Sequence, residues 1–229
     1  AVFIVGVSRI GTMLLARVLD SRTQLAIARD YQYLGHLLRR EGARYYFRRV
    51  GDLQDDANVR RLVRLIWSGE FQHRSRLREV SPYWRWLTRT VRQEDFEDRL
   101  LRSGRSEVDV FTVMMRTYAD VTGKRIIGEK TPAHLASVDT LFDWYPDARV
   151  IHVLRDPRAV YVSEVRRRAA NPSSVPYRYL VRAPRLLRAF VLLDQLAQYA
   201  HVALVEIRHT VVDFVGKDLA AELAGCDRG

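Results

Sequence analysis

The chain has 229 residues and a mass of 26.6 kDa, a size that suits one domain. Its apolar fraction of 48% excludes global disorder, and its single cysteine, Cys226, excludes a disulfide framework and a cysteine-based zinc site. Lys and Arg number 38 against 27 Asp and Glu, for a net charge of +11, and most of the bases are Arg. Because Arg binds phosphate or sulfate through paired hydrogen bonds, we expect an anionic ligand, although most of these arginines fit an ordinary solvated surface.

The single cysteine fits a reducing compartment, and no apolar stretch approaches the roughly 20 residues that a membrane-spanning helix needs. We therefore expect a cytoplasmic protein without a membrane span.

The chain begins with a strand, a helix and a second strand. Residues 2–6 (VFIVG) and 25–28 are short apolar runs typical of buried strands, and residues 12–20 carry apolar side chains at helical spacing. The pattern is then helical from about residue 35 to residue 123. Within it, Asp55 can cap one of the helices.

Strand and helix alternate again after this helical segment. Strand character returns in residues 125–128, 149–154 and 201–207. Helical periodicity occurs around residues 135–144, 157–168 and 184–199. This alternation predicts an α/β fold: a P-loop-like parallel sheet of about five strands, flanked by helices, with a helical insertion (about 35–123) between strands two and three. We expect one domain over residues 1–229, with the insertion as a cap near the carboxyl ends of the strands, where such sheets bind ligands.

A glycine-containing loop joins the first strand to the first helix, and it reads Gly6-Val7-Ser8-Arg9-Ile10-Gly11-Thr12-Met13. Glycines let backbone N–H groups turn toward an anion, and a helix N-terminus adds its positive dipole. Nucleotide triphosphatases place Lys and then Ser or Thr after the second glycine, to bind phosphates and Mg²⁺, and here Thr12 and Met13 stand there. The loop predicts an anion site without a metal, with Arg9 supplying charge; a tight turn without a ligand is the alternative.

A second anion site is predicted after residues 149–154. Arg155 follows the strand directly, Asp156 is a suitable N-cap, and Pro157 fits a first helical turn. Ser163 comes about two turns later and can present its hydroxyl on the same side as Arg155. An Arg and a Ser that converge there suit a phosphate.

Together the two loops resemble those of sulfotransferases that use 3′-phosphoadenosine 5′-phosphosulfate (PAPS), in the branch that contains protein-tyrosine sulfotransferases and many bacterial enzymes. In that family the first loop reads Arg-Ser-Gly-Thr-Thr-Leu and binds the 5′-phosphosulfate. The second reads Arg-Asp-Pro-Arg-Ala, has a Ser farther along, and binds the 3′-phosphate. The corresponding segments here are Arg9-Ile10-Gly11-Thr12-Met13-Leu14 and Arg155-Asp156-Pro157-Arg158-Ala159 with Ser163, and Gly128-Glu129-Lys130-Thr131-Pro132 also looks like a family segment.

The resemblance implies in-line transfer of a sulfuryl group from PAPS to a hydroxyl or amine acceptor, without a metal. It implies catalytic roles for Arg9 and Lys130, which would stabilise charge on the transferred group; a surface lysine paired with Glu129 is the alternative for Lys130. The PAPS-binding residues that it implies are Arg9, Ile10, Gly11, Thr12, Met13, Leu14, Arg155 and Ser163.

The acceptor proton needs a general base. The family has a Glu just after strand two, and Asp30 stands at that place here, one methylene shorter. Asp30 is therefore the predicted catalytic base, and an ion pair with Arg29 is its alternative reading. His36 is a second candidate for the base.

Several alternatives stay open. Ile10 and Met13 depart from the family loop, so a catalytically weak or inactive nucleotide-binding relative is one alternative, and a P-loop nucleotide kinase is another. The basic, aromatic stretch 39–50 could contact nucleic acid or form an amphipathic helix; no nucleic-acid partner is expected. Finally, Tyr83, Trp84 and Trp86 could line an acceptor site or form helical core. The identity of the acceptor and the oligomeric state are not predicted.

Overall fold

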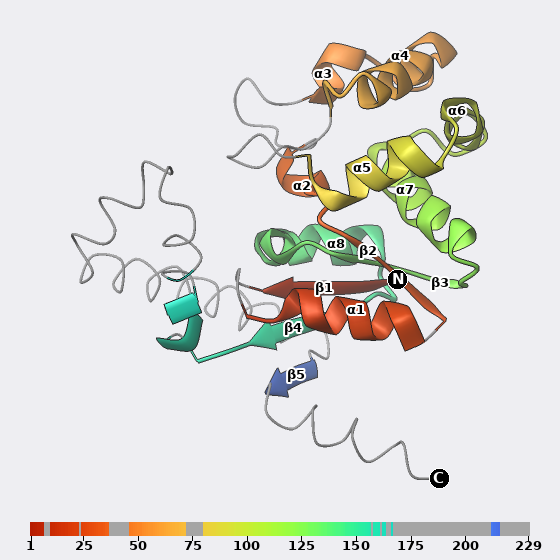
Figure 1. Cartoon of the computed structure of the whole chain (residues 1–229). Helices are drawn as coiled ribbons and strands as arrows, with labels where there is room; N and C mark the ends of the chain where they lie inside the picture. The colour runs from red at the N-terminus through yellow and green to blue at the C-terminus, as the bar shows by residue number, and fades with distance from the viewer. Residues whose placement is uncertain are drawn as a thin grey trace.

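Five parallel strands form one sheet in the computed structural model of the chain, in the order β2-β3-β1-β4-β5 (Figure 1). Their bounds are Val2–Gly6 (β1), Leu25–Arg29 (β2), Ile126–Lys130 (β3), Arg149–Leu154 (β4) and Val212–Val215 (β5). The structure describes residues 1–6, 10–22, 24–36, 46–71, 80–156, 158–160, 162, 163, 166 and 212–215. The predicted α/β class and parallel sheet are confirmed. The strand predicted at 201–207 and the helix predicted at 184–199 lie outside the described residues.

Helices flank the sheet and fill the interval between β2 and β3. The first helix is α1 (Thr12–Arg22), and the insertion contains α2 (Tyr33–His36), α3 (Tyr46–Val50), α4 (Asp56–Trp67), α5 (Pro82–Thr90), α6 (Gln93–Leu101) and α7 (Glu107–Val121). A 3₁₀ helix, η1 (Pro132–Ser137), and α8 (Val138–Trp144) separate β3 from β4. Among these helices, none has both the length and the apolar character needed to cross a membrane. The helical insertion between strands two and three is confirmed.

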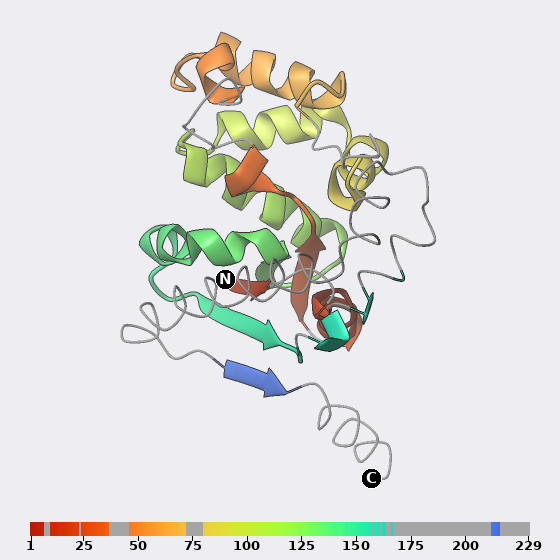
Figure 2. The same ribbon diagram turned by 90° about the vertical axis from the view of Figure 1, so that its left-hand side faces the viewer.

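Side-chain alternation in β1 builds a core on each face of the sheet. Phe3 and Val5 point to the face that α7, η1 and α8 cover, whereas Ile4 points to the face that α1 covers. Because parallel sheets are buried on both faces, β1 is apolar at every position that precedes Gly6. Figure 2 shows α8 and the insertion on one side of the strands. The insertion was expected as a cap at the strand ends, but α7 packs against β2 and β3 and so covers part of a face.

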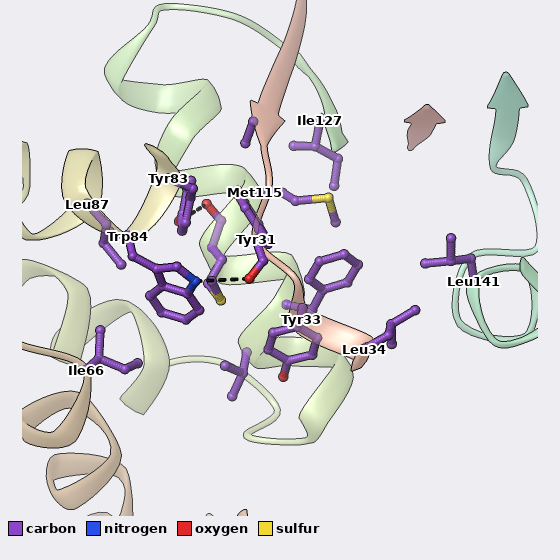
Figure 3. Packing of buried hydrophobic residues seen from close by; sticks show 14 of the residues in the cluster. Tyr31, Tyr33, Leu34, Ile66, Tyr83, Trp84, Leu87, Met115, Ile127 and Leu141 are labelled. Carbon is purple, nitrogen blue, oxygen red and sulfur yellow. Dashed lines mark hydrogen bonds between the residues drawn. The ribbon is translucent and has the colours of Figure 1, made fainter. Parts of the chain in front are cut away.

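Aromatic side chains join the insertion to the sheet (Figure 3). Tyr31 and Tyr83 are fully buried against each other, and Trp84 donates its indole N–H to the carbonyl oxygen of Tyr31 at 3.0 Å. The hydroxyl of Tyr83 donates to the Met114 carbonyl oxygen at 2.8 Å. Tyr83 and Trp84 are therefore core residues, and the alternative that they line an acceptor site is wrong.

Local signals in the sequence explain where the insertion helices begin. Asp55 accepts a hydrogen bond from the Ala57 N–H and caps α4, as predicted. Ser106 and Asp109 form a capping box at the start of α7, so this helix begins at Glu107.

The third strand ends later than predicted. The run 125–128 was expected to be the strand, but β3 continues to Lys130, which pairs in register with Arg29 of β2 and Ile4 of β1. Two ladder neighbours thus hold the polar residues Glu129 and Lys130 in an extended, buried conformation that their side chains alone do not predict.

Candidate active site

Four chemically distinct groups lie at the carboxyl edge of four neighbouring strands. Asp30 follows β2, Lys130 ends β3, Gly6 ends β1 and opens the glycine-containing loop, and Arg155 follows β4. Since neighbouring strands lie about 4.8 Å apart, the backbone positions span three intervals, or roughly 14 Å. Ligands bind at this edge of open parallel sheets.

The glycine-containing loop starts from a backbone conformation that requires glycine. Gly6 has φ +144°, and a Cβ there would overlap Ile10 Cδ1 and lie 2.8 Å from the Val153 carbonyl oxygen. Ile10 is buried in the core beneath α1, so its side chain cannot reach an anion, and only its backbone can contribute. Residues 7–9 lie outside the described part of the chain, and the role of Arg9 stays a prediction.

The first turn of α1 offers backbone donors. Gly11 has φ +107° and precedes the helix without a side chain that could cap it, and no acidic residue occupies the first turn. Its carbonyl oxygen accepts the N–H groups of Leu14 at 2.9 Å and Leu15 at 3.1 Å. Thr12 is buried, whereas the side chain of Leu14 is 70% exposed and apolar. Of these residues, Thr12 alone adds a hydroxyl. The Leu14 N–H is already bonded to Gly11, so the N–H groups that this turn can offer an anion are those of Thr12 and Met13.

Met13 and Arg29 contact each other beside this turn. One Arg29 guanidinium nitrogen lies 4.0 Å from the Met13 sulfur, a weak contact. Arg29 also lowers the pKa of the neighbouring Tyr118 hydroxyl, but burial and a hydrogen bond to Asp20 outweigh it and raise that pKa to about 12.

Asp30 and Lys130 form an ion pair. The Lys130 Nζ lies 2.7 Å from Asp30 Oδ1, and the two side chains are 3% and 20% exposed. The alternative that Lys130 is a surface lysine paired with Glu129 is wrong, and so is the pairing of Asp30 with Arg29. A largely buried ammonium and a partly exposed carboxylate thus meet at the strand ends, where one can stabilise an anion and the other can accept a proton.

A buried polar network, which was not predicted from the sequence, lies beside this ion pair. Glu129 accepts hydrogen bonds from the Thr131 hydroxyl and from His134 Nδ1, the latter at 3.0 Å. The backbone N–H of Leu34 donates to His134 Nε2 at 3.3 Å, so the imidazole is the neutral Nδ1–H tautomer. The three side chains resemble a catalytic hydroxyl–imidazole–carboxylate set, but all are at most 1% exposed, and Nε2 faces a backbone amide rather than a nucleophile.

An open cleft of about 720 Å³ lies beyond the end of β4. It is lined by Arg155, Asp156, Arg158, Ala159, Val162, Ser163 and Arg166. The structure therefore places Arg155 and Ser163 on one cleft, as their spacing suggested. Arg166 was missed, although it comes one helical turn after Ser163 and so belongs to the same helix face.

Asp156 caps the helix that follows β4. Its Oδ1 accepts the Arg158 N–H at 2.8 Å, and its carbonyl oxygen accepts the N–H groups of Ala159 and Val160. The Arg158 side chain also donates to the Asp156 carboxylate, with one contact at 2.7 Å, and this pairing lowers the pKa of Asp156 to about 2. Asp156 thus pairs with Arg158, and Arg155 and Arg166 are the other two basic residues that line the cleft.

Two other predictions fall at the limit of the described chain. His36 ends α2, but its side chain lies outside the described residues. Of the basic stretch 39–50, the structure describes only α3, at Tyr46–Val50. Neither the second candidate base nor the nucleic-acid alternative is therefore tested.

The chain belongs to the sulfotransferase family, because the family model described as "Sulfotransferase family" matches residues 1–210. Among solved structures, the fold is similar to sulfotransferase STF1 from Mycobacterium tuberculosis H37Rv, with 18% identity and a TM-score of 0.48, covering 99% of this chain and 64% of that chain. It is also similar to sulfotransferase STF9 from Mycobacterium avium, with 12% identity and a TM-score of 0.45, covering 99% of this chain and 61% of that chain. The chain thus spans less than two thirds of either structure. No curated protein matches it.

Proposed function

We propose that this member of the sulfotransferase family transfers a sulfuryl group from PAPS to a hydroxyl or amine acceptor, without a metal. The observation that carries the proposal is the order of groups along one sheet edge: the Asp30–Lys130 pair, then the glycine-containing loop, then the Arg155 cleft. A donor with two anionic ends and an acceptor that must lose a proton need these groups side by side.

The donor set fits a ligand with two separate anionic groups. The N–H groups of Thr12 and Met13 at the start of α1, with the Thr12 hydroxyl, would bind the 5′-phosphosulfate. Arg155 and Ser163 would hold the 3′-phosphate, because a guanidinium and a hydroxyl line the same open cleft. Arg9 would add charge at the first of these sites.

The chemistry divides between the protein's own residues and the donor. PAPS supplies the sulfuryl group and leaves as 3′-phosphoadenosine 5′-phosphate (PAP). Lys130 would stabilise negative charge on the transferred group, because its ammonium is held at the edge with little solvent around it. The Asp30 carboxylate would take the proton from the attacking hydroxyl or amine, since it follows β2 at that edge and its side chain is partly exposed.

We also propose that residues 1–229 form one domain. The same hydrophobic core includes Phe3 of β1, Leu62 of α4 and Leu141 of α8, so the insertion and the sheet share buried surface.

Two lysines provide a matched pair of variants for testing the transferase. Lys130 ends β3 and pairs with Asp30, whereas Lys124 precedes β3 and pairs with Asp20 at 2.8 Å. Both are largely buried, but only Lys130 is at the ligand-binding edge. The protein is incubated with [³⁵S]PAPS, EDTA and a panel of phenols, sugars and amines, and both label transfer and PAP release are measured.

We expect metal-independent transfer that falls about 10²–10³-fold in Lys130→Met, the usual loss for a removed charge stabiliser. Lys124→Met is expected to keep its activity per folded molecule. PAP binding without transfer would leave a catalytically inactive nucleotide-binding relative. Neither binding nor transfer by the folded protein would refute the proposal.

A further inference from the structure

The segment that carries Asp30 has an unusual backbone conformation. Asp30 and Gln32 have φ values of +59° and +56°, in the left-handed region that non-glycine residues rarely adopt. Two such residues flank Tyr31, whose side chain is fully buried. A conformation of this kind persists only where surrounding contacts impose it, and such residues cluster at functional sites.

Contacts from two neighbouring elements impose it here. The Asp30 N–H donates to the Lys130 carbonyl oxygen at 2.7 Å, and this hydrogen bond attaches the first residue of the segment to the end of β3. Farther along, the N–H of Gln32 donates to the Thr131 hydroxyl oxygen at 3.3 Å, and the N–H of Leu34 donates to the His134 imidazole, also at 3.3 Å. Side chains thus replace the backbone partners that a strand or a helix would supply.

A single buried carboxylate sets the direction of both side-chain contacts. The Thr131 hydroxyl has one proton, which it gives to Glu129, so its oxygen is left to accept the Gln32 N–H. His134 donates its Nδ1–H to the same carboxylate, which leaves Nε2 to accept the Leu34 N–H. Glu129 therefore turns both side chains into acceptors that face the segment after β2.

We infer that Thr131 and His134, oriented by Glu129, are positioning residues that hold the 30–34 segment so that the Asp30 carboxylate lies against Lys130. This inference rests on the proposed role of Asp30 as the general base. The three side chains do not contact the solvent-exposed edge themselves, because each is at most 1% exposed. They act on Asp30 indirectly, through their hydrogen bonds to the backbone N–H groups of Gln32 and Leu34.

The test uses a hydroxyl that can be removed without changing shape. Thr131→Val deletes both hydrogen bonds of the hydroxyl, and Thr131→Ser retains them. Thr117→Val is the matched control, because Thr117 is also fully buried and its hydroxyl has no hydrogen-bond partner among the described residues.

The first readout is native-state amide hydrogen exchange of residues 30–34, which needs no substrate. We expect the protection factor of the Gln32 amide to fall at least about tenfold in Thr131→Val and to stay unchanged in Thr131→Ser and Thr117→Val. Unchanged protection in Thr131→Val would overturn the inference, provided that the protein is folded.

The second readout asks whether Thr131 acts through Asp30. PAPS with water as the acceptor is the probe: an oxygen–sulfur bond forms from water, the bond from sulfur to PAP breaks, and Asp30 takes a proton. In the wild-type background we expect Thr131→Val to lower kcat about 10- to 100-fold, with KM for PAPS unchanged, because misplacement of a reacting group costs about that much. Thr131→Ser should recover most of the rate.

In an Asp30→Asn background, Thr131→Val should change kcat by less than about twofold, because the group that it positions is already gone. An equal loss in both backgrounds would show a general structural role and overturn the inference. If the wild-type protein neither binds PAP nor consumes PAPS, the proposed function fails, and the exchange result alone decides whether Thr131 and His134 position this segment.

Discussion

Replacing Gly6 by Ala tests how the glycine-containing loop is built. At φ +144° a side chain strains the backbone by about 1–3 kcal/mol. The new Cβ would also overlap Ile10 Cδ1 and lie 2.8 Å from the Val153 carbonyl oxygen, and overpacking of this kind costs about 1–3 kcal/mol more. We therefore expect Gly6→Ala to lower the free energy of unfolding by about 2–6 kcal/mol, measured by urea denaturation followed by tryptophan fluorescence.

Gly11→Ala is the control for this experiment. Gly11 has φ +107°, but a Cβ there would meet no atom of the other described residues within 4 Å, so the expected cost is the backbone strain of about 1–3 kcal/mol. Ile10→Val removes Cδ1, and in combination with Gly6→Ala it should destabilise the protein by less than the two single changes together. Equal destabilisation by Gly6→Ala and Gly11→Ala, or simple additivity with Ile10→Val, would refute the reasoning.

Two further predictions concern the core and the cleft. Trp84→Phe leaves the buried Tyr31 carbonyl oxygen without its 3.0 Å hydrogen bond and leaves a cavity, so we expect a loss of about 2–4 kcal/mol in the same denaturation assay, and a loss below about 1 kcal/mol would contradict this. In an NMR titration, the Asp156 carboxyl should titrate with a pKa of about 2 and shift upward in Arg158→Ala. Because its pKa is depressed on folding, its contribution to stability is present above about pH 4 and is lost as the pH falls toward 2; an unshifted pKa in Arg158→Ala would show that Arg158 is not the main cause.

Periodicity and capping signals predict much of the fold because they act within a few residues. Asp55 caps α4, as its position in the sequence predicted. The bounds of β4 are those of the apolar run 149–154. The approximate limits of the insertion follow from the same local signals. The strand at Val212–Val215 was not predicted, and neither was the packing of α7 on a face of the sheet, which depends on contacts between distant segments.

The sequence predicts some residues of the candidate active site but not how they pair. Asp30 and Lys130 could each be singled out, but they are 100 residues apart, and their pairing depends on β2 and β3 being neighbours in the sheet. The buried network around Glu129 was missed because a Glu beside a Lys ordinarily indicates an exposed turn. Arg166 could have been found from its spacing relative to Ser163. The burial of the Ile10 side chain was not predicted either, and it leaves only the backbone of Ile10 for the predicted contact with the ligand.

The proposed function requires an anionic nucleotide at the carboxyl edge of the sheet, and calorimetric titration with PAP in the presence of EDTA tests this most directly. Arg155 follows β4 at that edge, while Arg149 begins the same strand at the opposite edge and is also exposed. We predict that wild-type protein binds PAP, that Arg155→Ala weakens binding by about 10- to 100-fold, as loss of a charged hydrogen bond implies, and that Arg149→Ala changes it less than about twofold. Absence of binding to the folded wild-type protein, or an equal loss in both variants, would contradict the account.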